Sequence, residues 1–436
     1  MRYAFLIFAI ILSCGVYAQR DTTLKNRFSI HVQATVIYQY KSGFSAKYSG
    51  DNSLITADES HVSVTSTLFA GAKLWKGAVV FINPEIAGGS GLSQVLGVGA
   101  APNGETFRIG DPSPKIYMAR LFYQQRFALS INKAWKEPDF NEMGGYYPEK
   151  YIALTVGKLS IADFFDDNEF SHDARTQFMS WALMDNGAWD YPADTRGYTP
   201  SIVLEYISPS FELRYGFSLE PLTANGRNMN WNITEAGSHS FEYTRRHKIN
   251  TRNGSIRLLG FLTVANMGNY KRSIELSPVN PDIEQTRVTG RTKFGFGISA
   301  DQYLADDLGC FLRLSWNDGN NETWTFTEID RSLSGGLTVT GKRWHRSDDN
   351  VGIAYVISGI SKPHRNYLMA GGKGFMLGDG NLNYTNEQLM ELYYSFALRK
   401  KSIYLSGAYQ LIINPAYNKD RHGPVNVFSV RFHARI

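Results

Sequence analysis

The chain has 436 residues with a formal net charge of +5, 14% aromatic residues and 40 glycines. This charge is too small and too dispersed to favour a nucleic-acid-binding protein. Abundant aromatic residues and glycines are more typical of strands and turns than of helices. The length fits either several soluble domains or one large barrel.

Residues 1–18 are predicted to be a secretory signal peptide. Arg2 precedes the short apolar run 3–12, and Val16 and Ala18 stand at the positions that signal peptidase reads. A lipoprotein signal at Cys14 is the rival interpretation, but Leu12 stands where a smaller residue is usual. The apolar run is shorter than the roughly 20 residues of a spanning helix. We therefore expect an exported protein whose residues 19–436 form a single domain.

The rest of the chain lacks a long apolar segment, which excludes a helical membrane protein. After the signal peptide, Cys310 is the single cysteine, so an internal disulfide framework is also excluded. Export without disulfides fits the envelope of a Gram-negative bacterium.

Apolar and polar residues alternate at both ends of the mature chain, in 28–40 and 427–436. Side chains on a strand point to opposite faces with a period of two, so each segment has one apolar and one polar face. Such strands at both termini predict a sheet that closes with its first strand beside its last.

Seven further segments alternate in the same way: 62–74, 117–131, 211–219, 312–316, 351–357, 390–398 and 403–411. Two-sided strands also occur in soluble sandwiches. The longer segments match the roughly 9–11 residues of a tilted membrane strand, and aromatic residues gather near their ends. An outer-membrane barrel is therefore favoured, with turns expected at 317–320, 334–336 and 377–380.

One segment, 161–200, breaks the alternation. At about 40 residues it is much longer than ordinary connections, and long loops are usually functional. We expect a short helix at 177–184 within it, and we expect the loop to fold inward and narrow a water-filled lumen.

The same segment supports a family assignment. Residues 157–199, GKLSIADFFDDNEFSHDARTQFMSWALMDNGAWDYPADTRGYT, closely resemble the matching stretch of the carbohydrate-selective porins of the OprB family. Further blocks before and after this segment match the family in the same order: NPEIAGG at 83–89, SWNDG at 315–319, AGGKGF at 370–375 and NPAYN at 414–418.

The resemblance implies an all-β fold, a transmembrane antiparallel β-barrel of about sixteen strands in the outer membrane. It also implies passive diffusion of glucose-type sugars into the periplasm. Expected partners are sugars, outer-membrane lipids, the barrel-assembly machinery during insertion and, as a possibility left open, further copies of the chain. The family commonly ends in Phe, whereas this chain ends in Ile436, so we expect a weaker assembly signal.

A sugar pore needs groups that exchange hydrogen bonds with hydroxyls and release them again. Arginines and carboxylates offer charge-assisted hydrogen bonds, and aromatic faces stack on sugar rings. The predicted pore-lining residues are Arg120, Arg126, Arg214, Arg313, Asp163, Phe165, Trp189, Asp190 and Arg196. Trp189 and Arg196 are expected nearest the sugar path. The alternative for each loop residue is packing, or an ion pair that holds the loop.

Motifs for catalysis, metal binding or cofactor binding are weak. The acidic run 166–169 with His172 and Asp173 matches no calcium-loop spacing, and the glycine-rich run 371–380 lacks the ending of a phosphate-binding loop. The sequence contains neither HExxH nor GxSxG. We expect no catalytic residue, metal or cofactor. Two alternatives stay open: an outer-membrane barrel enzyme, and a secreted β-rich carbohydrate-binding protein such as a lectin or glycosidase.

Overall fold

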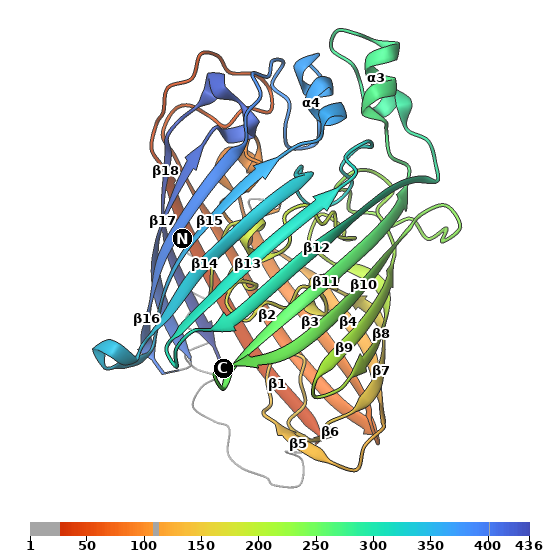
Figure 1. The fold of residues 1–436 in the computed structure, drawn as a ribbon, viewed down its shortest axis with the longest axis vertical. Coiled ribbons are helices and arrows are strands. Elements are labelled where there is room, and N and C mark those ends of the chain that lie inside the picture. Colours follow the sequence, from red (N-terminus) through yellow and green to blue (C-terminus); the bar gives the residue numbers. More distant parts are fainter. Residues whose placement is uncertain (1–26, 108–112, 401) are drawn as a thin grey trace.

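The computed structural model describes residues 27–107, 113–400 and 402–436, and the predicted signal peptide lies outside them. Sixteen antiparallel strands form a closed barrel (Figure 1). In chain order these are β1 (Phe28–Lys41), β2 (Glu59–Trp75), β3 (Ala78–Gly89), β4 (Lys115–Ala128), β7 (Tyr151–Leu159), β8 (Thr199–Ile207), β9 (Phe211–Ser218), β10 (Gly237–Ile249), β11 (Arg252–Ala265), β12 (Arg291–Tyr303), β13 (Leu308–Asn317), β14 (Arg331–Gly341), β15 (Arg346–Gly359), β16 (Glu387–Arg399), β17 (Ile403–Ile413) and β18 (Val425–Arg435).

The barrel closes between its first and last strands. β1 pairs antiparallel with β18, in a register that runs from Gln33 opposite Arg435 to Lys41 opposite Val427. Because every barrel strand is paired on both sides, its backbone polar groups are satisfied without an open sheet edge. The closure predicted from the two termini is confirmed.

The two faces of the barrel differ as the alternation predicts. The apolar rows point outward: Ile30 is 69% exposed, and Leu312 and Phe428 are about half exposed. The polar rows point inward and are covered, as Thr35 and His433 are, joined by a hydrogen bond of 2.9 Å. An apolar outer band around a polar interior is the arrangement that a lipid bilayer requires.

The two ends of the barrel also differ. At one end, the turn end, short connections join the strands: 76–77, 208–210, 250–251, 304–307, 342–345 and 400–402. At the other, the loop end, the connections are longer: 42–58, 90–114, 160–198, 219–236, 266–290, 318–330, 360–386 and 414–424. The loop end carries α3 (Tyr270–Leu276) and α4 (Lys362–Met369), at the top of Figure 1.

Short 3-10 helices also lie in these connections: η1 (Leu92–Val95), η2 (Ile161–Asp163), η3 (Glu284–Thr286), η4 (Lys342–Trp344), η5 (Pro415–Tyr417) and η6 (Lys419–Arg421). Among the helices in the described parts of the chain, none is both long enough and apolar enough to cross a membrane.

One connection at the turn end is an exception. Residues 129–150 contain a small hairpin of β5 (Lys133–Lys136) and β6 (Gly145–Pro148), which extends below the barrel in Figure 1. The residues between these two strands turn back toward the lumen and reach inward-facing side chains of the wall.

The long loop, residues 160–198, lies inside the barrel. Its backbone and side chains bond to inward residues of β10, β13, β16 and β18. Its helix α2 (Trp181–Met184) is shorter than predicted. The amides of Met179 and Ser180 donate to the carboxylate of Glu391 instead of to helical carbonyls, so the helix begins only afterwards.

The turn predicted at 334–336 is wrong, because these residues lie in the middle of β14. A Cβ on Gly336 would come within 2.6 Å of the ring of Phe311, so glycine permits close packing inside the barrel here. The glycines at 378 and 380 lie in the connection 360–386, with φ of +97° and +96°.

Candidate pore

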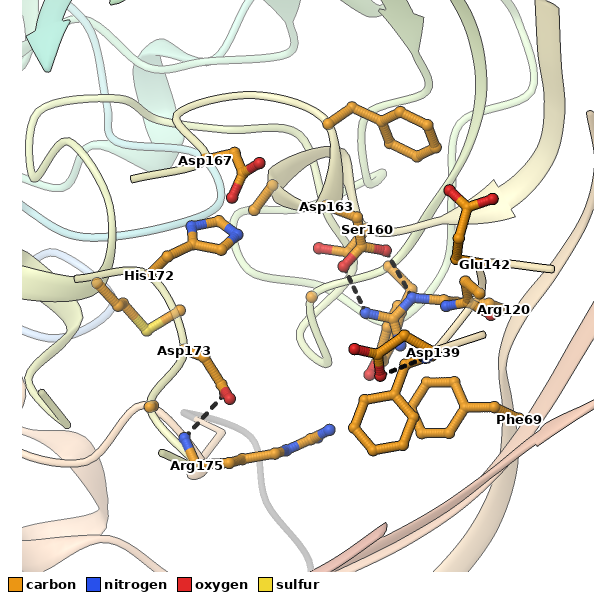
Figure 2. A pocket seen from close by; sticks show the side chains of 18 of the residues that line it. Phe69, Arg120, Asp139, Glu142, Ser160, Asp163, Asp167, His172, Asp173 and Arg175 are labelled. Atoms are coloured by element: carbon orange, nitrogen blue, oxygen red, sulfur yellow. Dashed lines mark hydrogen bonds and ion pairs between the residues drawn. The ribbon is translucent and has the colours of Figure 1, made fainter. Parts of the chain in front are cut away.

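The lumen contains a cavity of about 730 Å³ between the long loop and the wall (Figure 2). The wall side consists of inward residues of β1–β4, β7–β9 and the end of β18. A second cavity of about 450 Å³ lies toward the turn end. Lys136, Tyr151, Asp167 and Arg214 line both cavities, so the two spaces adjoin.

Arg120 and Asp163 form an ion pair at the surface of the first cavity. Arg120 lies on the inward side of β4, and Asp163 lies at the start of the long loop, in η2. Two hydrogen bonds of 2.6 Å join the guanidinium to the carboxylate, as the dashed lines in Figure 2 show. The guanidinium also lies 5.0 Å from the centre of the Tyr198 ring. Two residues predicted for the pore are thus brought together at its surface.

Arg196 lies on the loop side of the same cavity. Its guanidinium stacks over the ring of Tyr117, 4.0 Å from the ring centre. The Tyr117 hydroxyl donates to the carboxylate of Glu85, which also accepts from Tyr198 at 3.2 Å. Burial and the charge of Glu85 raise the pKa of Tyr198, so its hydroxyl stays protonated and remains a donor.

Two further wall arginines of the cavity, Arg126 and Arg214, are paired with carboxylates. Arg126 donates to Glu142 through two nitrogens, at 3.0 and 3.1 Å. Arg214 donates to Glu205 at 3.1 Å. Each of these arginines therefore has at least one carboxylate partner, and Arg214 also lies near Glu212 and Glu242.

The remaining four predicted residues do not line either cavity. Phe165 and Trp189 are fully buried and pack against each other, with ring centres 6.2 Å apart. Trp189, predicted near the sugar path, instead lies in the packed interior of the loop.

Asp190 and Arg313 connect the loop to its surroundings. The Asp190 carboxylate accepts from the amides of residues 324–326, at 2.8 to 3.0 Å. Arg313 donates to the carboxylate of Asp166 at 3.0 Å and to the carbonyls of Leu183 and Ser171. Asp190 therefore has the holding role that the sequence offered as the alternative for loop residues, and the wall residue Arg313, which was predicted to line the lumen, holds the loop as well.

Asp167, which was not among the predicted pore residues, lies exposed within the lumen and lines both cavities. Partial desolvation by the surrounding protein opposes ionisation, but the positive charges of His172, Arg257 and Arg214 lower the pKa of Asp167, so it is a carboxylate. Its position in the acidic run was a usable signal, because solvated or ion-paired carboxylates were the preferred interpretation of that run. The described residues contain no group of three or more potential metal ligands.

His172 faces the cavity beside Asp167 in Figure 2. Although burial opposes protonation, Asp185 at 3.6 Å and Asp167 raise the pKa of His172 to about 9. The imidazole therefore adds a positive charge to the loop side of the cavity at neutral pH.

Comparison with known proteins agrees with this architecture. The family described as "Carbohydrate-selective porin, OprB family" matches residues 51–435. The fold is similar to the high-pH structure of Pseudomonas putida OprB, with a TM-score of 0.70 and 15% identity over 95% of each chain. The low-pH structure of the same protein gives a TM-score of 0.50 and 12% identity, over 95% of this chain and 94% of that one. A search of curated proteins finds no match.

Proposed function

Because the chain belongs to the OprB family of carbohydrate-selective porins, we propose that its barrel lets glucose-type sugars diffuse passively across the outer membrane into the periplasm. The family and the fold indicate an outer-membrane channel rather than an enzyme. In this proposal the outer apolar band contacts the lipids of a Gram-negative envelope. The assembly machinery acts during insertion, and self-association is a further possibility.

The observation that carries the proposal is the chemistry of the cavity. A sugar hydroxyl both donates and accepts, and the Arg120–Asp163 pair presents donors and acceptors side by side. Charge-assisted hydrogen bonds are strong enough to replace water on hydroxyls. The half-buried ring of Phe164 at the same cavity supplies an apolar face for a pyranose. Conduction also requires release, and such contacts at a water-filled surface remain reversible.

The proposed sugar path therefore includes Arg120, Arg126, Arg214, Asp163 and Arg196. Asp163 and Arg196 belong to the long loop and face the wall, so in this proposal the loop forms the constriction. Phe165, Trp189, Asp190 and Arg313 act indirectly, by keeping the loop in place.

The test is conductance of the purified protein in a planar bilayer, titrated with glucose. We expect sugar to reduce the ion current in a saturable manner, and we expect R120A to weaken this block. R272A is a matched control, because Arg272 is an exposed arginine on α3 outside both cavities. A closed channel, or a current that does not respond to sugars, would contradict the proposal.

A further inference from the structure

The residues between β5 and β6 enter the lumen at the turn end. We call residues 137–144 the inner turn segment. The ring of Phe140 stacks on inward-facing Phe69 of β2, with ring centres 4.4 Å apart. Met143 is buried beside Gly71, where an added Cβ would meet its sulfur at 2.8 Å. The segment is thus packed against the inner wall.

Polar contacts attach the inner turn segment to both sides of the barrel seam. Asp139 pairs with Arg435 of β18 at 2.5 Å, and Glu142 pairs with Arg126 of β4. Between them, Lys73 of β2 donates to the carbonyl of Gly144 at 2.8 Å. Since β18, β1, β2, β3 and β4 are consecutive in the barrel, the segment lies across the inner surface of this part of the wall.

The segment also lines the first cavity. Asp139, Phe140, Asn141 and Glu142 all contribute to its surface. Figure 2 shows Asp139 and Glu142 on the same side of the cavity as Arg120, opposite Asp167 and His172. A solute that leaves Arg120 toward the turn end along this side of the cavity therefore passes the two carboxylates.

The charges at this mouth are nearly balanced. Three cationic groups, Arg126, Lys136 and Arg435, line the cavity there, and Glu142 and Asp139 are their partners. Glu142 serves two of them, since Lys136 also lies 3.3 Å from its carboxylate. Without the carboxylates, the mouth would have three uncompensated positive charges, and such charges attract anions.

We propose that the inner turn segment is a second selectivity filter, in which Asp139 and Glu142 neutralise the basic mouth and favour neutral sugars over anionic ones such as sugar acids. This filter is separate from the constriction formed by the long loop. It rests on the proposed function insofar as the solute is a sugar.

The experiment compares E142Q, D139N and the double variant with the parent in planar bilayers under a salt gradient. We expect the reversal potential to shift toward anion selectivity in each single variant and further in the double variant. In liposome swelling, we expect entry of gluconate relative to glucose to rise in the same order. E137Q is the control, because Glu137 belongs to the segment, bonds to Trp135 at 2.8 Å and lines neither cavity.

A further variant replaces residues 138–143 with a glycine-serine linker. We expect it to give a larger single-channel conductance, since it removes the packed segment from the mouth. Heat-modifiable migration on a gel verifies that each variant forms a closed barrel. If E142Q fails to close, D139N and the linker variant supply the same readouts.

Unchanged reversal potential and conductance in the closed variants would overturn the filter. This outcome differs from failure of the proposed function, because ion selectivity is measured without sugar. A parent current that ignores sugars would refute sugar conduction, whereas a shifted reversal potential in E142Q would still support the charge filter.

Discussion

Arginines point into the lumen from the barrel strands on both of its sides, but they bond to different groups on the two sides. On the filled side, the long loop packs against β10, β12, β13, β16 and part of β18. On the open side, a cavity lies between the loop and β1–β4 and β7–β9, and only some side chains, such as Asp163, reach from the loop to this wall. Arg313 and Arg120 represent the two sides.

The difference lies in what each guanidinium bonds to. Arg313 is 1% exposed and donates to loop carbonyls and to a buried carboxylate. Arg431 likewise donates to the carbonyls of Ala174 and Gln177, both at 2.7 Å. Arg120, whose side chain is 11% exposed, instead pairs with one side chain, Asp163, which is 32% exposed. An arginine that satisfies buried backbone holds the loop, whereas one paired at a cavity surface is accessible to solute.

The largest expected effect is on the filled side. R313A should lower the free energy of unfolding by about 3–5 kcal/mol, because it leaves the Asp166 carboxylate buried without its charged partner. Urea denaturation monitored by heat-modifiable migration measures this loss. R399A is the control, since Arg399 is exposed at the turn end and should change stability by less than about 0.5 kcal/mol. If R313A were as stable as the control R399A, Arg313 would not hold the loop, and the proposed difference between the filled side and the open side would be wrong.

The second effect belongs to the open side. R120A should weaken block of the current by glucose about tenfold, which corresponds to loss of one charged hydrogen-bonding group worth roughly 1.5 kcal/mol. Its stability should fall by only about 1 kcal/mol, because the pair with Asp163 is partly exposed. Sugar titrations and denaturation of the same preparation separate the two effects. Unchanged sugar block would show that Arg120 is not on the path.

Arg196 and Trp189 provide a smaller contrast within the loop itself. R196A should weaken sugar block about threefold, because it removes a cation stacked on Tyr117 at the cavity, an interaction worth roughly 0.5–1 kcal/mol. W189F should leave sugar block unchanged and lower stability, since Trp189 is buried away from the cavity. The reverse result, weaker block in W189F alone, would return Trp189 to the sugar path.

The smallest effect is a pH dependence on the loop side. The pKa of His172 is raised from 6.5 to about 9, so its stabilising charge is fully present below pH 6.5 and is lost as the pH rises through 9. Between pH 7 and 10 the current should therefore shift toward cations, and stability should decrease. In H172Q the change in ion selectivity between pH 7 and pH 10 should be smaller. Reversal potentials measured at the two pH values test this. An identical shift in H172Q would exclude His172 as its source.

The alternation of side chains along the sequence by itself determined much of the fold. Within the nine alternating segments, period two assigned most wall residues to the inner or outer face, because a strand has only two faces. The rows at 28–40 and 427–436 thereby identified the pair that closes the barrel. The resemblance across 157–199 identified the family, and the unusual length of 161–200 predicted the loop that enters the lumen.

Only the tertiary structure decided which inward residues face a solute. Arg313 and Asp166 are 147 positions apart and Arg435 and Asp139 are 296 apart, so neither pairing is visible in local sequence. Such contacts depend on barrel closure and on the path of chain inside it, which bring together side chains from opposite ends of the sequence. For the same reason, the position of the inner turn segment in the lumen could not be predicted from its own sequence, because it depends on contacts with distant residues of the wall.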